Sequence, residues 1–299
     1  FVHSLMDGAE NTISGYLNVS VCGGNTANTE FEFLTGNTMA FLPQGSVPYQ
    51  QYVKQEIPAL PSYLKSLGYD TCAMHPYYAG GWDRSRVYPL LGFDDLAFIT
   101  DFSDRTYIRN YISDQSCVNK IIRTYEEKED GKPAFIFNVT MQNHGSYNDA
   151  YENFTPDISV EGTESYALSS YLSLISKTDQ ALQELIRYFS EAEEPVMIVF
   201  FGDHQPNDTV AEPILRLNGM SSATLTEEER DLRYQVPYVI WANYDIAEEP
   251  HADTSANYLA MKVLKAAGIP LNGYQKFEEE LADSYPVISA QRILGADGT

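Results

Sequence analysis

The sequence predicts an α/β protein with a mainly parallel central sheet and helices on both of its faces. Two observations support this class. Short apolar runs typical of buried strands alternate with longer segments whose apolar residues recur at helical spacing. One of these runs, "VMIVFF" at residues 196–201, is continuously apolar, as expected for a strand covered on both faces of a parallel sheet.

Individual elements follow from local patterns. A helix is predicted from Asn25 or Thr26 to Gly36, because Asn and Thr favour helix starts and Gly favours helix ends. Further helices are predicted to end at Leu67, to span residues 172–189 and to span residues 255–267. Strands are predicted at residues 69–74, 134–139 and 196–201, and in the segment "VPYVIWANYD".

The domain organisation is predicted to be one catalytic domain over residues 1–299. The loop after Pro206 and the tail after Leu271 are interpreted as excursions from it, the tail forming a small C-terminal α+β piece. No run approaches the roughly 18 apolar residues of a membrane span. The chain opens without Met, so we expect a longer protein that continues upstream.

The net charge and the cysteine content exclude several classes of function and of site. The formal net charge of −23 argues against nucleic-acid binding and against unaided binding to an anionic membrane, since both need basic clusters. An anionic substrate remains possible if a metal ion supplies positive charge locally. The three cysteines, Cys22, Cys72 and Cys117, are widely spaced and suggest buried thiols rather than a zinc site or a disulfide framework.

Chemically active side chains follow the predicted strands. In open α/β sheets the functional crevice lies outside the carboxyl ends of the strands, so residues there are site candidates. Asp203 and His204 follow one strand, and with a Thr or Ser oxygen they would suit Mn²⁺ or Zn²⁺. The other candidates come after two more strands: His75, Trp82, Arg84 and His144. Taken singly, each also has a purely structural explanation, as a turn residue or a core side chain.

The stretch "VCGGNTANTEF" leaves two roles open for Thr26. It can be a helix cap, which is the commoner role of such a threonine. It can also be a nucleophile, because metal coordination activates a hydroxyl and a helix N-terminus favours an incoming phosphate. The second role predicts displacement at phosphorus or sulfur through a covalent intermediate.

Four motifs occur in the order found in one known family: "GYLNVSVCGGNTANTEFEFLTGNT", "HPYYAGGWDRSR", "TMQNHGSY" and "VMIVFFGDHQP". With them the chain resembles the extracellular catalytic domain of lipoteichoic acid synthases. These are phosphoglycerol transferases of the alkaline phosphatase and sulfatase superfamily. The resemblance implies the superfamily's α/β fold. It also implies an extracellular location at a bacterial membrane, with tethering by upstream helices absent from this chain.

The resemblance also implies roles for residues. Thr26 matches the nucleophile and a metal contact, and Asp203 and His204 match two further metal ligands. The implied cofactor is Mn²⁺, with Mg²⁺ or Zn²⁺ as alternatives. The implied substrate pocket for the phosphoglycerol group contains His75, Trp82, Arg84 and His144. The implied partners are phosphatidylglycerol and a glycerol phosphate polymer or glycolipid acceptor.

The chain departs from the family pattern in two places. The family's remaining metal ligand is a Glu that ends a first sheet strand upstream of the nucleophile, and Glu10 lacks an apolar strand before it. We therefore expect that this first strand lies outside the sequence. Tyr77 and Tyr78 stand where more polar pocket residues are expected, which leaves the acceptor open. Cys22 lacks the Pro and Arg of a formylglycine motif, so a sulfatase activity of that type is not expected.

Three functions are compatible with these residues. The leading prediction is a metal-dependent phosphoglycerol transferase that works through a phospho-threonine intermediate. The same site could instead pass the intermediate to water, as a phosphodiesterase or phosphatase does. A metal-deficient domain that only binds glycerol phosphate is the third possibility.

Overall fold

The computed structural model describes residues 1–298, which form two compact units. The first unit contains Phe1–Tyr52, Ile186–Asn207 and the chain from Ala223 onward. The second unit contains Val53–Leu185 and Asp208–Ser222. The prediction of one domain therefore stays a prediction, and each unit is described by itself below.

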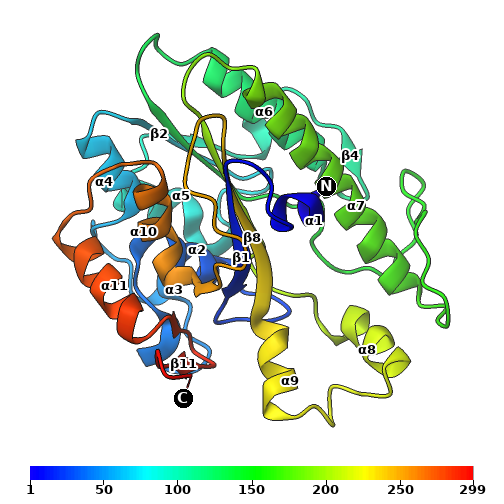
Figure 1. Cartoon of the computed structure of the whole chain (residues 1–299). Helices are drawn as coiled ribbons and strands as arrows, with labels where there is room; N and C mark the ends of the chain where they lie inside the picture. The colour runs from blue at the N-terminus through cyan, green and yellow to red at the C-terminus, as the bar shows by residue number, and fades with distance from the viewer. Residues whose placement is uncertain (299) are drawn as a thin grey trace. The chain divides into compact units, whose positions relative to one another are not determined.

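The sheet of the first unit has four strands in the order β7-β8-β1-β9. Their bounds are Thr12–Asn18 (β1), Met197–Phe201 (β7), Gln235–Ala242 (β8) and Thr254–Ser255 (β9). β8 runs antiparallel to both of its neighbours, whereas β1 and β9 are parallel. β1 and β8 are labelled side by side in Figure 1. β7 and β8 were predicted as strands, but the antiparallel direction of β8 was not.

β1 is the longest of several strands that sequence patterns missed, because Gly15 interrupts it and lowers its apparent strand propensity. The glycine is needed there: a Cβ on Gly15 would lie 2.8 Å from the backbone carbon of Ala252. The expected upstream strand that ends in Glu concerns chain outside this sequence and stays untested.

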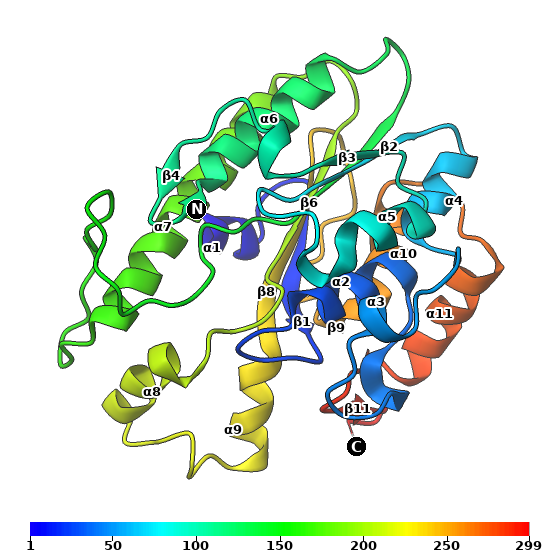
Figure 2. The same ribbon diagram turned by 180° about the vertical axis from the view of Figure 1, so that it is seen from behind.

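The helices of the first unit surround this sheet. They are α1 (Val2–Met6), α2 (Thr26–Thr35), α3 (Pro48–Gln51), α9 (Glu227–Asp231), α10 (Ala256–Ala266) and α11 (Gly273–Ser284), with 3-10 turns at Met39–Phe41 and Leu232–Tyr234. α10 packs against α2 (Figure 2). The predicted C-terminal α+β piece is α11 followed by the hairpin β10 (Val287–Ile288) and β11 (Ile293–Leu294). Its apolar contacts join Tyr258 and Met261 of α10 to Ile288 of β10.

The sheet of the second unit is fully parallel, in the order β3-β2-β6 (Figure 2). The strands are β2 (Asp70–Met74), β3 (Asp95–Ala97) and β6 (Ala134–Asn138), and a separate hairpin pairs β4 (Tyr107–Ile108) with β5 (Tyr111–Ile112). The helices are α4 (Leu60–Ser66), α5 (Arg84–Leu91), α6 (Asp114–Glu126) and α8 (Asp208–Leu217), with 3-10 turns at Gly81–Asp83 and Ile99–Asp101. α7 (Tyr166–Ser190) continues along the chain from the second unit into the first.

The parallel strands and the helices that alternate with them confirm the predicted α/β class. β2 begins within one residue of its prediction, and α4 is followed by Gly68 with a positive φ of 94°. The thiols are free in the described chain. Cys117 is buried as predicted, whereas Cys22 and Cys72 are only half-buried. Across residues 1–298, no helix is both long and apolar enough to cross a bilayer.

Candidate functional site

Thr26 and Asp203 meet in the first unit. Thr26 is the first residue of α2, and Asp203 lies two residues after the end of β7. The Thr26 hydroxyl donates to Oδ2 of Asp203 at 2.5 Å. Thr29, one turn along the helix, donates its hydroxyl to the backbone carbonyl of Asp203 at 2.6 Å. The start of α2 therefore holds both the side chain and the backbone of Asp203.

The alternative role of Thr26 as a helix cap is wrong. The cap position belongs to Asn25, which has a left-handed backbone (φ 67°), and no side-chain cap hydrogen bond forms there. The Thr26 hydroxyl instead contacts the carboxylate of Asp203. A Thr or Ser oxygen turned from its own helix toward an acidic group fits a nucleophile better than a cap.

Glycines let the two loops of this site approach each other. Gly23 has a φ of 75°, and its backbone N–H donates to the carbonyl of Gln205 at 2.8 Å. A Cβ at Gly23 would lie 3.1 Å from Cβ of Asn207. The space beside Gly24 is open, with no heavy atom within 4 Å of a Cβ placed there. The expected room for a group beside Thr26 is therefore present in the first unit.

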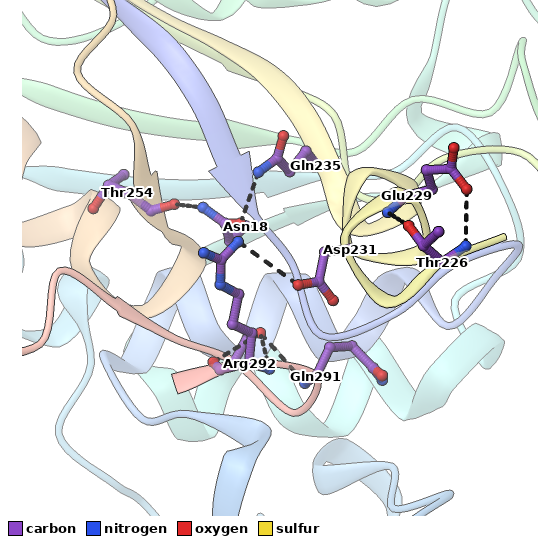
Figure 3. A network of polar contacts seen from close by, with 9 residues as sticks. Asn18, Thr226, Glu229, Asp231, Gln235, Thr254, Gln291 and Arg292 are labelled. Atoms are coloured by element: carbon purple, nitrogen blue, oxygen red, sulfur yellow. Dashed lines mark hydrogen bonds and ion pairs between the residues drawn. The ribbon is translucent and has the colours of Figure 1, made fainter. Parts of the chain in front are cut away.

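The base of the Thr26 loop is anchored by a polar network at the end of β1 (Figure 3). Asn18 donates to the carbonyl of Thr254 at 2.9 Å and accepts from the Gln235 amide at 3.3 Å. Two residues further on, the hydroxyl of Ser20 donates to the buried Glu32 at 2.8 Å. Burial raises the pKa of Glu32 to about 7. Sequence patterns alone gave no reason to single out these residues.

His204 faces the same carboxylate. Its Nδ1 lies 2.9 Å from the carbonyl oxygen of Gln205, so Nδ1 carries the proton and donates. In the neutral ring, Nε2 is then an acceptor, yet it lies 3.2 Å from Oδ2 of Asp203, which is also an acceptor. Two acceptors hold this separation favourably only with a proton or a cation between them.

These three side chains fit the implied metal ion. The hydroxyl of Thr26, the carboxylate of Asp203 and Nε2 of His204 are oxygen and nitrogen donors of the kinds that Mn²⁺ and Zn²⁺ accept. Among residues 1–298, no third His, Cys, Asp or Glu joins them to complete a cluster of metal ligands. The described residues therefore supply three donors of suitable types but no complete cluster of metal ligands.

The second unit holds the other predicted residues, and two of them are in contact. His75 follows β2, and its Nδ1 donates to the carbonyl of Val139 at 2.9 Å. Its Nε2 consequently accepts from Nη1 of Arg84, the first residue of α5, at 3.1 Å. His75 and Arg84 are 1% and 3% exposed, so this contact is shielded from water. His75 thus supports Arg84 directly.

Trp82 precedes Arg84 in a tight 3-10 turn. Trp82 and Asp83 both have left-handed backbones, with φ of 55° and 59°. Such conformations are costly for residues other than glycine, and they concentrate at binding and catalytic sites. The Trp82 side chain is half-buried. The proposed roles of Trp82 and Arg84 stay predictions.

His144 lies in an exposed loop after β6, and Tyr111 of β5 orients it. Nδ1 of His144 lies 2.8 Å from the carbonyl oxygen of Gly145 and 3.1 Å from the hydroxyl of Tyr111. The Tyr111 hydroxyl also donates to the Gly145 carbonyl at 3.2 Å. Nδ1 therefore carries the proton, and Nε2 is the acceptor of the neutral ring.

Arg109 is a residue that sequence reasoning missed. It lies in the two-residue turn between β4 and β5, with a φ of 57°, and it is 4% exposed. Its guanidinium donates to the carbonyls of Gln142, His144 and Ser146 at 2.6–2.8 Å. The near-symmetrical string "YIRNYI" is the sequence signal that could have revealed this hairpin.

Comparisons with known proteins identify the family. The sulfatase family profile matches residues 11–269, and the chain belongs to that family. A Rhizobium meliloti protein named for cyclic beta-1,2-glucan modification is 33% identical over 282 residues, which are 92% of this chain and 44% of that protein. The chain thus spans less than half the length of this relative.

Two solved structures have the same fold. The phosphoglycerol transferase GacH of Streptococcus pyogenes, in complex with sn-glycerol-1-phosphate, gives a TM-score of 0.76 at 22% identity, over 96% of this chain and 72% of that one. The lipoteichoic acid synthase LtaP of Listeria monocytogenes gives 0.70 at 22% identity, over 91% and 67%. The predicted resemblance to lipoteichoic acid synthases is confirmed, and at this identity the two structures establish the fold.

Proposed function

We propose that this chain is the catalytic domain of a metal-dependent phosphoglycerol transferase that uses Thr26 as its nucleophile. The observation that carries the proposal is the 2.5 Å contact between the Thr26 hydroxyl and Asp203 at the start of α2. The fold supports it, because members of the superfamily are transferases or hydrolases and one structural relative is a phosphoglycerol transferase.

In the first step, Oγ1 of Thr26 forms a bond to the phosphorus of phosphatidylglycerol, and the bond to the diacylglycerol oxygen breaks. Asp203 Oδ2 is placed to accept the hydroxyl proton, which diacylglycerol carries away in exchange. The N-terminus of the ten-residue helix α2 favours the added negative charge. In the second step, an acceptor hydroxyl takes the phosphoglycerol group from Thr26.

A divalent cation held by Thr26, Asp203 and His204 would lower the pKa of the threonine hydroxyl and offset the phosphate charge. Mn²⁺ is the ion we propose, with Mg²⁺ or Zn²⁺ as substitutes. Asp203 is kept in place for this role by Thr29, which holds its backbone carbonyl. His204 is kept in place by its own bond to Gln205.

In the second unit, we assign the phosphoglycerol group to Arg84, Trp82 and His144. Arg84 supplies a planar cation suited to phosphate oxygens, and its partner His75 steadies it. Trp82 supplies an apolar face, and we propose that the His144 ring lines the pocket for the same group. The whole protein would act on the extracellular side of a bacterial membrane, tethered by helices upstream of this chain.

The decisive experiment is to incubate the Mn²⁺-loaded protein with phosphatidylglycerol and to search by mass spectrometry for a phosphoglycerol adduct on Thr26. Thr26→Ala should abolish both the adduct and diacylglycerol release, whereas Thr26→Ser should retain both. Fold loss is not expected for Thr26→Ala, since one hydrogen bond contributes about 1 kcal/mol. Absence of both products from the full-length protein would rule the transferase out. Release of glycerol phosphate to water in the presence of an acceptor would make it a hydrolase.

A further inference from the structure

Four aromatic rings form a continuous contact chain in the second unit. Tyr78 meets Tyr77 edge to face, with ring centroids 4.9 Å apart. Tyr77 meets Tyr111 at 6.0 Å, and Tyr111 meets His144 at 5.5 Å, with both pairs tilted by 53–58°. The ends of this ring cluster are open, since Tyr78 is 64% exposed and His144 is exposed. Tyr77 and Tyr78 are the residues that depart from the polar pocket expected of the family.

Arg109 holds the loop beside the ring cluster in place. Arg109 ties together three carbonyls of the loop that carries His144, and its guanidinium lies 5.6 Å from the ring centre of Tyr111. This cation is buried, and burial lowers the pKa of Arg109. Its backbone is also left-handed. A buried cation in a strained turn is costly, and the three hydrogen bonds of Arg109 to this loop offset that cost while fixing the loop.

The edges of the ring cluster carry polar groups. The His144 ring presents Nε2 as an acceptor, because Nδ1 is committed to the Gly145 carbonyl. Burial and the neighbouring Tyr77 raise the pKa of Tyr111, so its phenol stays protonated, and that proton is donated to the Gly145 carbonyl. Apolar ring faces beside hydroxyl donors and acceptors are what a sugar ring needs, because its C–H face packs on aromatics while its hydroxyls bond outward.

We propose that the ring cluster of Tyr77, Tyr78, Tyr111 and His144 is the docking site for a neutral glycan, which is the acceptor of the phosphoglycerol group. This deepens the proposed function and rests on it. Charge favours a glycan over a glycerol phosphate polymer, because a protein of net charge −23 repels a polyanion. The 33% identical relative named for cyclic beta-1,2-glucan modification supports the same class of acceptor.

The transfer to such an acceptor balances without a further reactant. A sugar hydroxyl oxygen forms the new bond to phosphorus, and the bond from phosphorus to Oγ1 of Thr26 breaks. The proton of the sugar hydroxyl returns to the Thr26 oxygen. The glycan leaves with one phosphodiester for each hydroxyl used, and the threonine is restored.

The test measures binding of cyclic beta-1,2-glucan to the 299-residue chain by titration calorimetry, beside a glycerol phosphate oligomer of similar size. Tyr78→Ala removes the most exposed ring and should weaken glucan binding about 3- to 10-fold. Tyr78→Trp, which keeps a ring, should retain it. The matched control is Tyr166→Ala, on an exposed tyrosine of the same unit that lies outside the cluster, and it should change nothing.

The inference is overturned if the glucan fails to bind, if Tyr78→Ala and Tyr166→Ala bind it equally, or if the glycerol phosphate oligomer binds more tightly than the glucan. This readout is independent of the Thr26 adduct. If the adduct forms but the glucan does not bind, the proposed glycan site is wrong and the proposed transferase activity stands. If the glucan binds but no adduct forms, the proposed transferase activity is wrong, and the ring cluster is a glycan-binding surface without that activity.

Discussion

The candidate-site histidines of the two units are oriented by the same kind of hydrogen bond, but their second ring nitrogens have different surroundings. His204 in the first unit, and His75 and His144 in the second, each commit Nδ1 to a backbone carbonyl at 2.8–2.9 Å. Each ring therefore has a fixed orientation, and Nε2 is left to act. What differs is the group that Nε2 meets.

In the first unit Nε2 of His204 meets the carboxylate of Asp203, and only a proton or a cation makes that contact favourable. In the second unit Nε2 of His75 accepts from Arg84, while no described protein group contacts Nε2 of His144. We therefore propose three roles for one residue type: a metal ligand for His204, a support for the Arg84 cation for His75 and a hydroxyl acceptor for His144. The partner of one ring nitrogen decides which.

The largest effect should come from the carboxylate of the first unit. Asp203→Asn removes the charge that faces both Thr26 and His204 and should lower kcat about 10²- to 10⁴-fold. Mn²⁺ should raise the Tm of the unmodified protein and fail to raise that of Asp203→Asn, since binding stabilises only a competent site. The exposed Asp7→Asn serves as the control. If Mn²⁺ raises the Tm of all three proteins equally, Asp203 is not a ligand of the metal ion.

Chelation offers a second way to test the difference between the units. Removing divalent cations with EDTA should abolish adduct formation on Thr26, because the hydroxyl then loses its activating charge. Added Mn²⁺ should restore it. The proposed glucan site in the second unit needs no metal ion, so glucan should still bind to the ring cluster in the presence of EDTA. Adduct formation in the presence of EDTA would contradict the role given to the cation.

Within the second unit, His75 and His144 should respond differently to the same change. His75→Gln disturbs a buried contact to Arg84, and should raise KM about tenfold and lower Tm, since bonds to buried charged groups contribute about 1.5–3 kcal/mol. His144→Gln affects an exposed ring and should leave Tm unchanged while weakening ligand binding. Equal Tm losses in the two variants would contradict the distinction drawn between them.

The smallest expected effect concerns a buried carboxyl of the first unit that contrasts with Asp203. Glu278 on α11 is 3% exposed, whereas the Asp203 side chain is 39% exposed. Burial raises the pKa of Glu278 from 4.5 to about 8. Its contribution to stability is therefore complete below about pH 4.5 and is lost as the pH rises through about 8, because the folded state must give up a proton it holds more tightly.

Glu278→Gln should flatten this pH dependence and stabilise the protein at pH 9 relative to the unmodified chain. Urea unfolding from pH 5 to pH 9 measures it. The exposed neighbour Glu280→Gln should keep the original slope. A slope that persists in Glu278→Gln would assign the pH dependence to another group, of which the buried Glu32 is the first candidate.

Much of the fold could be predicted because the signals are local. The limits of α2, α4 and α10 follow from their caps and apolar spacing, and the Thr26 and Asp203 motifs could be located from their neighbours along the chain. β1 could not be predicted from the sequence, because its glycine is explained only by the close approach of Ala252 in the folded chain. Arg109 escaped because its three carbonyl partners lie 33 to 37 residues away.

The sequence by itself determined the positions of several helices and strands and the residues that can carry the chemistry, since both depend on spacing over a few positions. Only the tertiary structure decided what those residues do. Whether Thr26 caps its helix or contacts Asp203 depends on a loop 177 residues away, and which nitrogen of His75 accepts from Arg84 depends on a carbonyl 64 residues away. Hydrogen bonds act over about 3 Å, so roles set by them are fixed only when distant segments meet.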